Sequence, residues 1–190
     1  MARRILILNG HPDPEAMHFD HALADAYQRG AEAAGHRVER IDVGTLDVPV
    51  LRSKQAYEEE PPPPAIADAQ RAEHLVILYP LWLGTMPGLL KLFLEQVLRP
   101  AFAFDYRAKG LPKKRLTGRS ARIVVTMGMP ALAYRLFYGA HSLRSLKRNI
   151  LHFVGIKPVA ATLIGGVEAL GEAGRTRWLA KLEALGRKGA

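Results

Sequence analysis

The 190-residue sequence contains no cysteine. It therefore forms no disulfide and offers no thiolate, which fits a reducing compartment such as the cytoplasm. Signals for export and membrane insertion are also missing. The N-terminal "MARRILILNG" has an apolar run of only Ile5 to Leu8, too short for a secretory signal. The most apolar stretch, residues 75–96, is interrupted by two prolines and two glycines, so we expect a soluble, cytoplasmic protein.

Common catalytic signatures are absent too. The sequence has neither the Gly-x-Ser-x-Gly elbow of many hydrolases nor the His-Glu-x-x-His pattern of zinc proteases. Its seven histidines do not follow a metal-ligand spacing, so no metal site is predicted. The glycine spacings of dinucleotide-binding and phosphate-binding loops are also missing.

Charge is distributed unevenly. Residues 1–100 carry 10 Lys or Arg against 14 Asp or Glu, whereas residues 101–190 carry 17 against 4. A basic half fits nucleic acid, an acidic membrane surface or an anionic ligand, and equally a solvated basic face. The basic clusters at 113–115 and 144–148 lack the interleaved aromatic residues of a base-stacking surface, so nucleic-acid binding is not expected.

Strand and helix patterns alternate along the chain. Aliphatic or alternating runs predict strands at residues 3–9, 36–43, 74–80, 121–128 and 158–165. Helical periodicity predicts helices at 19–35, 88–98, 140–155 and 171–188, with Pro87 in a first helical turn and "EEEPPPP" extended and exposed. This alternation predicts one α/β domain over residues 1–190. It is a three-layer sandwich around a five-stranded parallel sheet of order 2-1-3-4-5.

Ligands of such sheets bind beyond the carboxyl ends of the strands, where this chain places three unusual loops. The loop after the first strand offers His11 and the amides of a following helix, which suit an anion, although a purely structural His11 fits equally. The loop after the third strand offers Trp82 before Gly84, as a flat wall or as a core or dimer contact. Tyr134 and His141 follow the fourth strand. Such a pocket suits a redox cofactor better than hydrolysis.

Four segments carry a resemblance to a known family. These are "GHPDP", "YPLWLGTMPGLLKLFLEQV", "TMGMP" and "GAHSLRSLKRNILHFVGI", which occur in this order between Arg4 and Gly166. In them the chain resembles the flavodoxin-like NAD(P)H:quinone oxidoreductases, the group that includes DT-diaphorase and bacterial quinone reductases associated with drug modulation and potassium efflux. The resemblance implies bound FAD or FMN and NADH or NADPH as co-substrate. It also implies a homodimer with sites at the interface and ping-pong two-electron transfer to a quinone or similar flat acceptor.

The resemblance also implies roles for individual residues. Tyr134 and His141 match the family's polar pair beside the flavin, where they would stabilise negative charge and share protons with the quinone. Residues carried over as flavin contacts are His11, His18, Phe19 and Asp20 at the phosphate end, Pro80, Leu81, Trp82 and Leu83 along the ring, and Thr126, Met127 and Gly128 at its other edge.

One departure from the family lies in the first loop. Relatives usually place a Ser or Thr there before the Phe, whereas residues 15–18 read "EAMH" and offer no hydroxyl. Glu15 would repel a phosphate, and an inward-pointing His18 would substitute for the hydroxyl. This departure favours an alternative function, a flavin- or nucleotide-binding regulatory protein that acts on a membrane transporter with little turnover.

Overall fold

The fold is built on one parallel sheet. A computed structural model describes residues 2–15, 17–58 and 71–190. Its main strands are β1 (Arg4–Asn9), β2 (Arg37–Asp42), β3 (His74–Pro80), β6 (Ser120–Met127) and β7 (Val159–Gly165). They pair in the order β2-β1-β3-β6-β7, all parallel. Numbered along the chain, these five strands have the predicted order 2-1-3-4-5.

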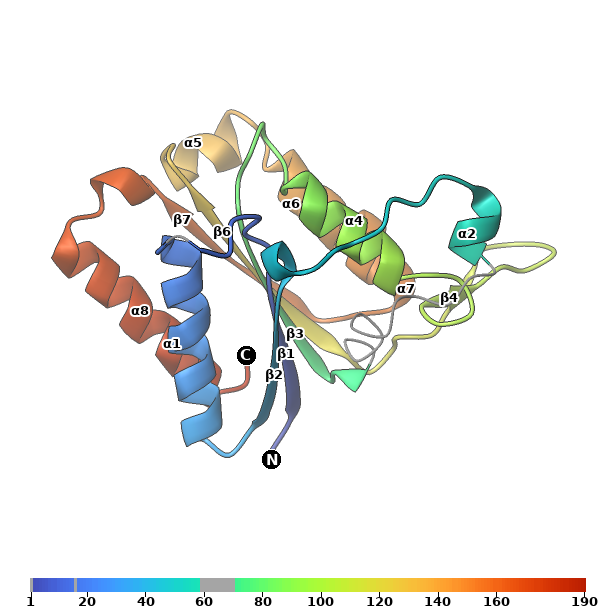
Figure 1. The fold of residues 1–190 in the computed structure, drawn as a ribbon, viewed down its shortest axis with the longest axis horizontal. Coiled ribbons are helices and arrows are strands. Elements are labelled where there is room, and N and C mark those ends of the chain that lie inside the picture. Colours follow the sequence, from blue (N-terminus) through green and yellow to red (C-terminus); the bar gives the residue numbers. More distant parts are fainter. Residues whose placement is uncertain (1, 16, 59–70) are drawn as a thin grey trace.

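Helices cover both faces of the sheet (Figure 1). One face carries α1 (Phe19–Ala33) and α8 (Glu172–Arg187), which pack against each other. The other face carries α4 (Gly88–Val97) and a continuous helical segment of α6 (His141–Ser145), the π-helical η3 (Leu146–Leu151) and α7 (His152–Val154). The predicted three-layer sandwich is therefore confirmed.

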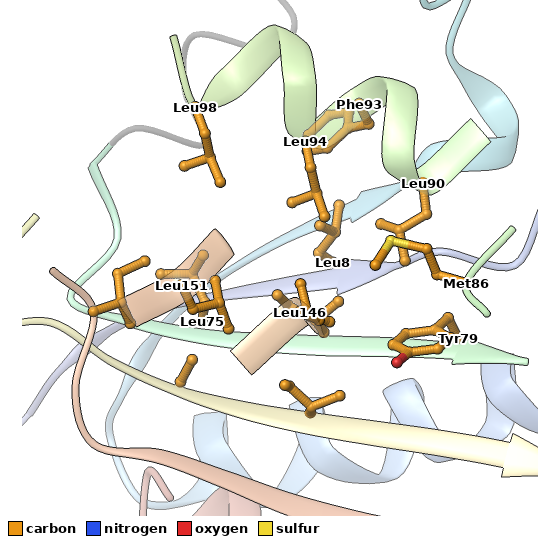
Figure 2. Close-up of a cluster of buried hydrophobic side chains, with 14 of the residues drawn as sticks. Leu8, Leu75, Tyr79, Met86, Leu90, Phe93, Leu94, Leu98, Leu146 and Leu151 are labelled. Atoms are coloured by element: carbon orange, nitrogen blue, oxygen red, sulfur yellow. The ribbon is translucent and has the colours of Figure 1, made fainter. Parts of the chain in front are cut away.

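Alternating residues of the central strands fill the two cores. Ile5 and Ile7 of β1 face the core beneath α1 and α8, whereas Leu6 and Leu8 face the core beneath α4. On this second side, Leu90, Phe93 and Leu94 of α4 pack over the sheet and the α6–α7 segment (Figure 2). Because both faces are buried, the inner strands read as continuous aliphatic runs.

Several features of the structure differ from the sequence prediction. Residues 99–119, for which no element was predicted, contain a small antiparallel sheet of β4 (Phe104–Asp105) and β5 (Lys113–Lys114). Pro87 is the N-cap of α4 instead of lying in its first turn. The predicted extended prolines, Pro61 to Pro64, lie outside the described residues. Short helices are η1 (Val43–Thr45), α2 (Lys54–Glu58), α5 (Ala131–Leu136) and η4 (Val167–Ala169). Across the described ranges, no helix has the length and apolarity needed to cross a membrane.

Candidate functional site

A cavity of about 460 Å³ lies where the loops after β1, β3 and β6 meet. The parallel sheet brings the carboxyl ends of these strands to one edge, which explains why loops distant in sequence share one cavity. Ten of the eleven residues predicted to contact a cofactor line it: His11, His18, Phe19, Asp20, Pro80, Leu81, Trp82, Thr126, Met127 and Gly128.

The first loop is held by a network of imidazole and amide groups. The Asn9 side-chain amide donates to Asp42 Oδ1 at 2.8 Å and lies 2.7 Å from Nδ1 of His21. The other nitrogen of His21 lies 2.9 Å from the Asp13 carbonyl oxygen. Since the amide of His11 donates to Asn9 Oδ1, the loop is tied to β1, to the end of β2 and to α1. This network fixes where His11 enters the cavity.

His11 and His18 form one wall of the cavity. Their rings stack with centroids 3.8 Å apart, and His18 Nε2 lies 2.9 Å from Asp13 Oδ2. Burial, together with the neighbouring imidazoles, lowers the pKa of His11, although the Asp13 backbone opposes the shift. His18 is also the N-cap of α1, and its side chain does not cap the helix. The amide of His21 donates to the His18 carbonyl oxygen at 3.1 Å, and no side chain caps the start of this 15-residue helix, an arrangement that suits an anion.

Asp20, in the first turn of α1, is a buried acid in the same cavity. Its side chain accepts a hydrogen bond of 2.7 Å from the Thr126 hydroxyl at Oδ2, and the residue is only 4% exposed. Among the described residues, Oδ1 has no hydrogen-bond partner. Burial raises the pKa of Asp20 to about 6, despite the opposing effects of the Thr126 hydrogen bond and the nearby His21 and His18. The carboxyl group therefore changes charge near pH 6.

Trp82 stands at the start of a two-residue turn. Its amide donates to the Thr85 carbonyl at 2.9 Å, and the Thr85 amide donates back at 2.9 Å. Leu83 and Gly84, the two central residues, have φ of 46° and 77°, as in the tight turns of β-hairpins. The turn leaves Trp82 about half exposed, with its ring edge-on to His11 at 6.1 Å. Leu83 points into solvent at the tip and does not line the cavity.

Tyr134 and His141 do not reach the cavity lining. Tyr134, on α5, is 2% exposed, and its hydroxyl lies 2.6 Å from Ser142 Oγ while accepting from the amide of Leu143. These bonds tie α5 to the first turn of α6. His141 is exposed at the start of α6. The catalytic roles of both residues stay predictions.

Sequence analysis missed part of the cavity wall, which also includes Met17, Val167, Glu168 and Arg175. Val167 and Glu168 follow the fifth sheet strand, so the rule that ligands bind beyond strand ends could have indicated them. Arg175 lies in α8, with its guanidinium 5.4 Å from the Phe19 ring centroid, and no sequence signal pointed to it. In the part of the chain that the structure describes, no group of three or more His, Asp or Glu side chains is arranged to hold a metal ion.

A comparison with known protein families matches residues 3–185 to a family described as having a flavodoxin-like fold. The chain belongs to this flavodoxin-like family. The strand order and the position of the cavity beside β1 and β3 agree with that assignment. The resemblance inferred from the four sequence segments is thereby confirmed.

Two curated relatives give the scale of similarity for this flavodoxin-like chain. It is 29% identical over 119 residues to an FMN-dependent NADH:quinone oxidoreductase of Bordetella avium, a match covering 63% of the chain and 56% of the relative. It is 34% identical over 95 residues to an FMN-dependent NADH:quinone oxidoreductase 1 of Hahella chejuensis, covering 50% and 44%. The chain therefore spans about half the length of the curated relatives it matches.

Solved structures match this flavodoxin-like chain over almost its whole length. A Streptococcus mutans protein superimposes with a TM-score of 0.80 at 26% identity, covering 97% of the chain and 99% of its own. An NAD(P)H:quinone oxidoreductase of Methanothermobacter marburgensis gives a TM-score of 0.79 at 24% identity, covering 99% and 97%. The second likeness, at this identity, supports the fold alone.

Proposed function

We propose that the protein is a flavin-dependent NAD(P)H oxidoreductase that passes two electrons to a quinone or a similar flat acceptor. The observation that carries this proposal is the cavity itself. It joins the N-terminus of α1 to a half-exposed Trp82 and to residues 126–128. Its volume of about 460 Å³ lies within the usual range for cofactor sites.

The residues of the cavity fit the two ends of a flavin. His11, His18 and the first turn of α1 would hold the phosphate, because they supply imidazole and backbone N–H donors. Pro80, Leu81 and Trp82 would border the flat ring system. Gly128 would let the backbone approach the ring closely, since it has no side chain. The relatives named FMN-dependent NADH:quinone oxidoreductases favour FMN and NADH over FAD and NADPH.

A bound flavin would supply two half-reactions. When bound, it would supply transfer of one hydride from NADH or NADPH and of two electrons to the quinone, which would also take up two protons, one of them from solvent. The chain's own residues would bind the phosphate, orient the ring and limit access of water. The names of the relatives support an enzyme and give no support to the regulatory alternative. The cytoplasmic location stays a prediction.

The test is a visible absorption spectrum of protein incubated with FMN and then desalted. We expect about one retained flavin per chain, bleached by anaerobic NADH and restored by a soluble naphthoquinone. Trp82→Ala should retain less flavin because it removes a wall of the cavity. Trp178→Ala, at the other tryptophan, is the matched control because Trp178 lies in α8 outside the cavity and should retain flavin normally. Flavin that washes away from the wild type, or that NADH does not bleach, would contradict the proposal.

The same spectrum tests the predicted polar pair. In Tyr134→Phe combined with His141→Gln, flavin should stay bound and bleach with NADH, whereas its reoxidation by the quinone should slow. An unchanged rate of reoxidation would remove both residues from the reaction.

We further propose that the protein is a homodimer with its sites at the interface. Large apolar side chains are exposed on α5 and just after it, at the sheet edge that holds the cavity: Leu132 is 64% exposed, Leu136 75% and Phe137 84%. Exposed apolar clusters of this kind commonly mark protein interfaces. A second copy of the chain would cover this cluster and complete the wall of the cavity near Trp82.

Charged substitutions in the apolar cluster should dissociate the dimer. Leu136→Glu combined with Phe137→Glu is expected to shift the sedimentation coefficient from dimer to monomer, because two buried carboxylates would lack partners. Leu111→Glu, at a leucine that is 85% exposed and lies between β4 and β5, is the control and should leave the mass unchanged. A wild type that sediments as a monomer at micromolar concentration would refute the dimer.

A further inference from the structure

The proposed phosphate end of the cavity contains an acidic side chain, where a bound phosphate would bring negative charge. Asp20 lines the cavity in the first turn of α1, the same turn whose amides suit an anion. Asp20 is only 4% exposed, so ionisation would leave its negative charge in a buried position. Among the described residues, its Oδ1 accepts no hydrogen bond that could stabilise this charge. A second anion bound nearby would add repulsion in a poorly solvated site.

We propose that Asp20 must be protonated when the cavity holds a flavin phosphate, so that phosphate binding takes up one proton at this residue. This inference rests on the proposed flavin-binding function and adds a determinant of its specificity. At acidic pH the neutral Asp20 does not discriminate between phosphorylated and unphosphorylated flavins. At alkaline pH the ionised Asp20 selects against the phosphorylated one.

Other charges around the cavity act on the same equilibrium and must be separated from Asp20. The titratable and charged groups are His11, Asp13 and His18 in the first loop, His21 of α1, Asp42 and its partner Arg40 of β2, Glu168 of η4 and Arg175 of α8. Protonated histidines and Arg175 attract a phosphate, whereas Glu168 repels it. His21 and His18 favour the ionised form of Asp20. The burial of Asp20 has the larger effect and raises the pKa of Asp20 to about 6. Thr126, which donates to Oδ2, does not titrate in this range.

The isosteric variant Asp20→Asn isolates this one proton. Asparagine has the shape of the protonated acid and keeps an oxygen that can accept from Thr126, but it carries no charge at any pH. The dissociation constant of FMN should be measured by fluorescence titration at pH 5.5 and 7.5 for both proteins. The readout is the ratio of the wild-type constant to the variant constant, because ionisation of FMN itself and of the histidines contributes to both.

We expect this ratio to lie near 1 at pH 5.5 and to reach about 30 at pH 7.5, since uptake of one proton changes affinity tenfold per pH unit above the pKa. With riboflavin, which lacks the phosphate, the ratio should stay near 1 at both pH values. Asp25→Asn is the matched control in the same helix, because Asp25 is exposed and pairs with Arg40 outside the cavity. For this control the ratio should stay near 1 at both pH values.

The outcomes separate this inference from the function on which it rests. If neither protein binds FMN or riboflavin at either pH, the proposed function fails. If both bind but the FMN ratio is the same at pH 5.5 and 7.5, only the role of Asp20 fails. A variant that binds FMN more weakly than the wild type at pH 7.5 also overturns it, because the carboxylate would then favour the phosphate. Riboflavin binding by the variant at pH 5.5 shows that it is folded.

Discussion

Gly186→Val should lower the free energy of unfolding by about 3 kcal/mol, the upper part of the range for overpacked cores. Gly186 of α8 lies directly against the backbone of α1. A Cβ atom there would lie 2.1 Å from the Tyr27 carbonyl oxygen and 2.9 Å from the amide nitrogen of Ala31. The contact is reciprocal, because a Cβ at Gly30 would lie 2.0 Å from the Glu183 carbonyl oxygen. Backbone atoms cannot rotate away as side chains can, so the two helices must separate.

Thermal and urea unfolding would measure this loss. For a chain of this length the melting temperature should fall by about 6–12 °C. Gly174→Val is the control in the same helix, because a Cβ there meets only the side chain of Leu170, which can move. Equal stability of the Gly186 and Gly174 variants would show that the close approach of α1 and α8 is not what makes glycine necessary.

Asp20→Asn should stabilise the flavin-free protein at neutral pH, which is unusual for a substitution in a ligand cavity. Burial raises the pKa of Asp20 from 3.8 to about 6. Between pH 3.8 and about pH 6, the native state therefore keeps a proton on Asp20 that the unfolded state has lost. Stability from this group is therefore present below about pH 4 and is lost as the pH rises through 6. The shift corresponds to about 3 kcal/mol. The variant should match the wild type near pH 4 and exceed it by about that amount at pH 7.5.

Urea unfolding at these two pH values tests the assignment. Asp25→Asn, which changes an exposed carboxyl of the same helix, should show no gain that grows with pH. If Asp20→Asn were less stable than the wild type at pH 7.5, the ionised carboxylate would have to be stabilised by a donor or cation. The charge conflict proposed for phosphate binding would then have no basis.

The layout of the sheet could be predicted from the sequence because burial on both faces leaves a plain signal. The continuous aliphatic run at residues 74–80 coincides with β3, and the residues predicted for the fifth strand differ from β7 by one at its start. The small β4–β5 sheet was not predicted because its two-residue strands are too short for any periodicity. The π-helical turn at Leu146–Leu151 was predicted only as helix, since the hydrophobic pattern of one π turn does not differ enough from that of an α-helix.

The sequence could predict which loops form the candidate site, but not which polar and charged side chains enter it. Parallel strands place their carboxyl ends at one edge, so the loops holding His11, Trp82 and Gly128 had to meet. Tyr134 was predicted beside the ligand, and this role stays a prediction; in the structure its hydroxyl lies 2.6 Å from Ser142 Oγ, a contact that the sequence did not indicate. Arg175 was missed because it belongs to α8, and the sequence does not indicate how α8 packs against the cavity.

The sequence by itself determined the fold, the absence of thiol chemistry and three of the loops that line the cavity, because each depends on local patterns or on residue types. Only the tertiary structure decided that Asp20 is buried with Thr126 as its donor and that Gly186 lies against the backbone of α1. The hydrogen bond joins two residues 106 positions apart in the sequence. The close contact of Gly186 joins α8, near the C-terminal end of the chain, to α1, near its N-terminal end. Burial and close contact are properties of such pairs of segments, so neither segment alone could reveal them.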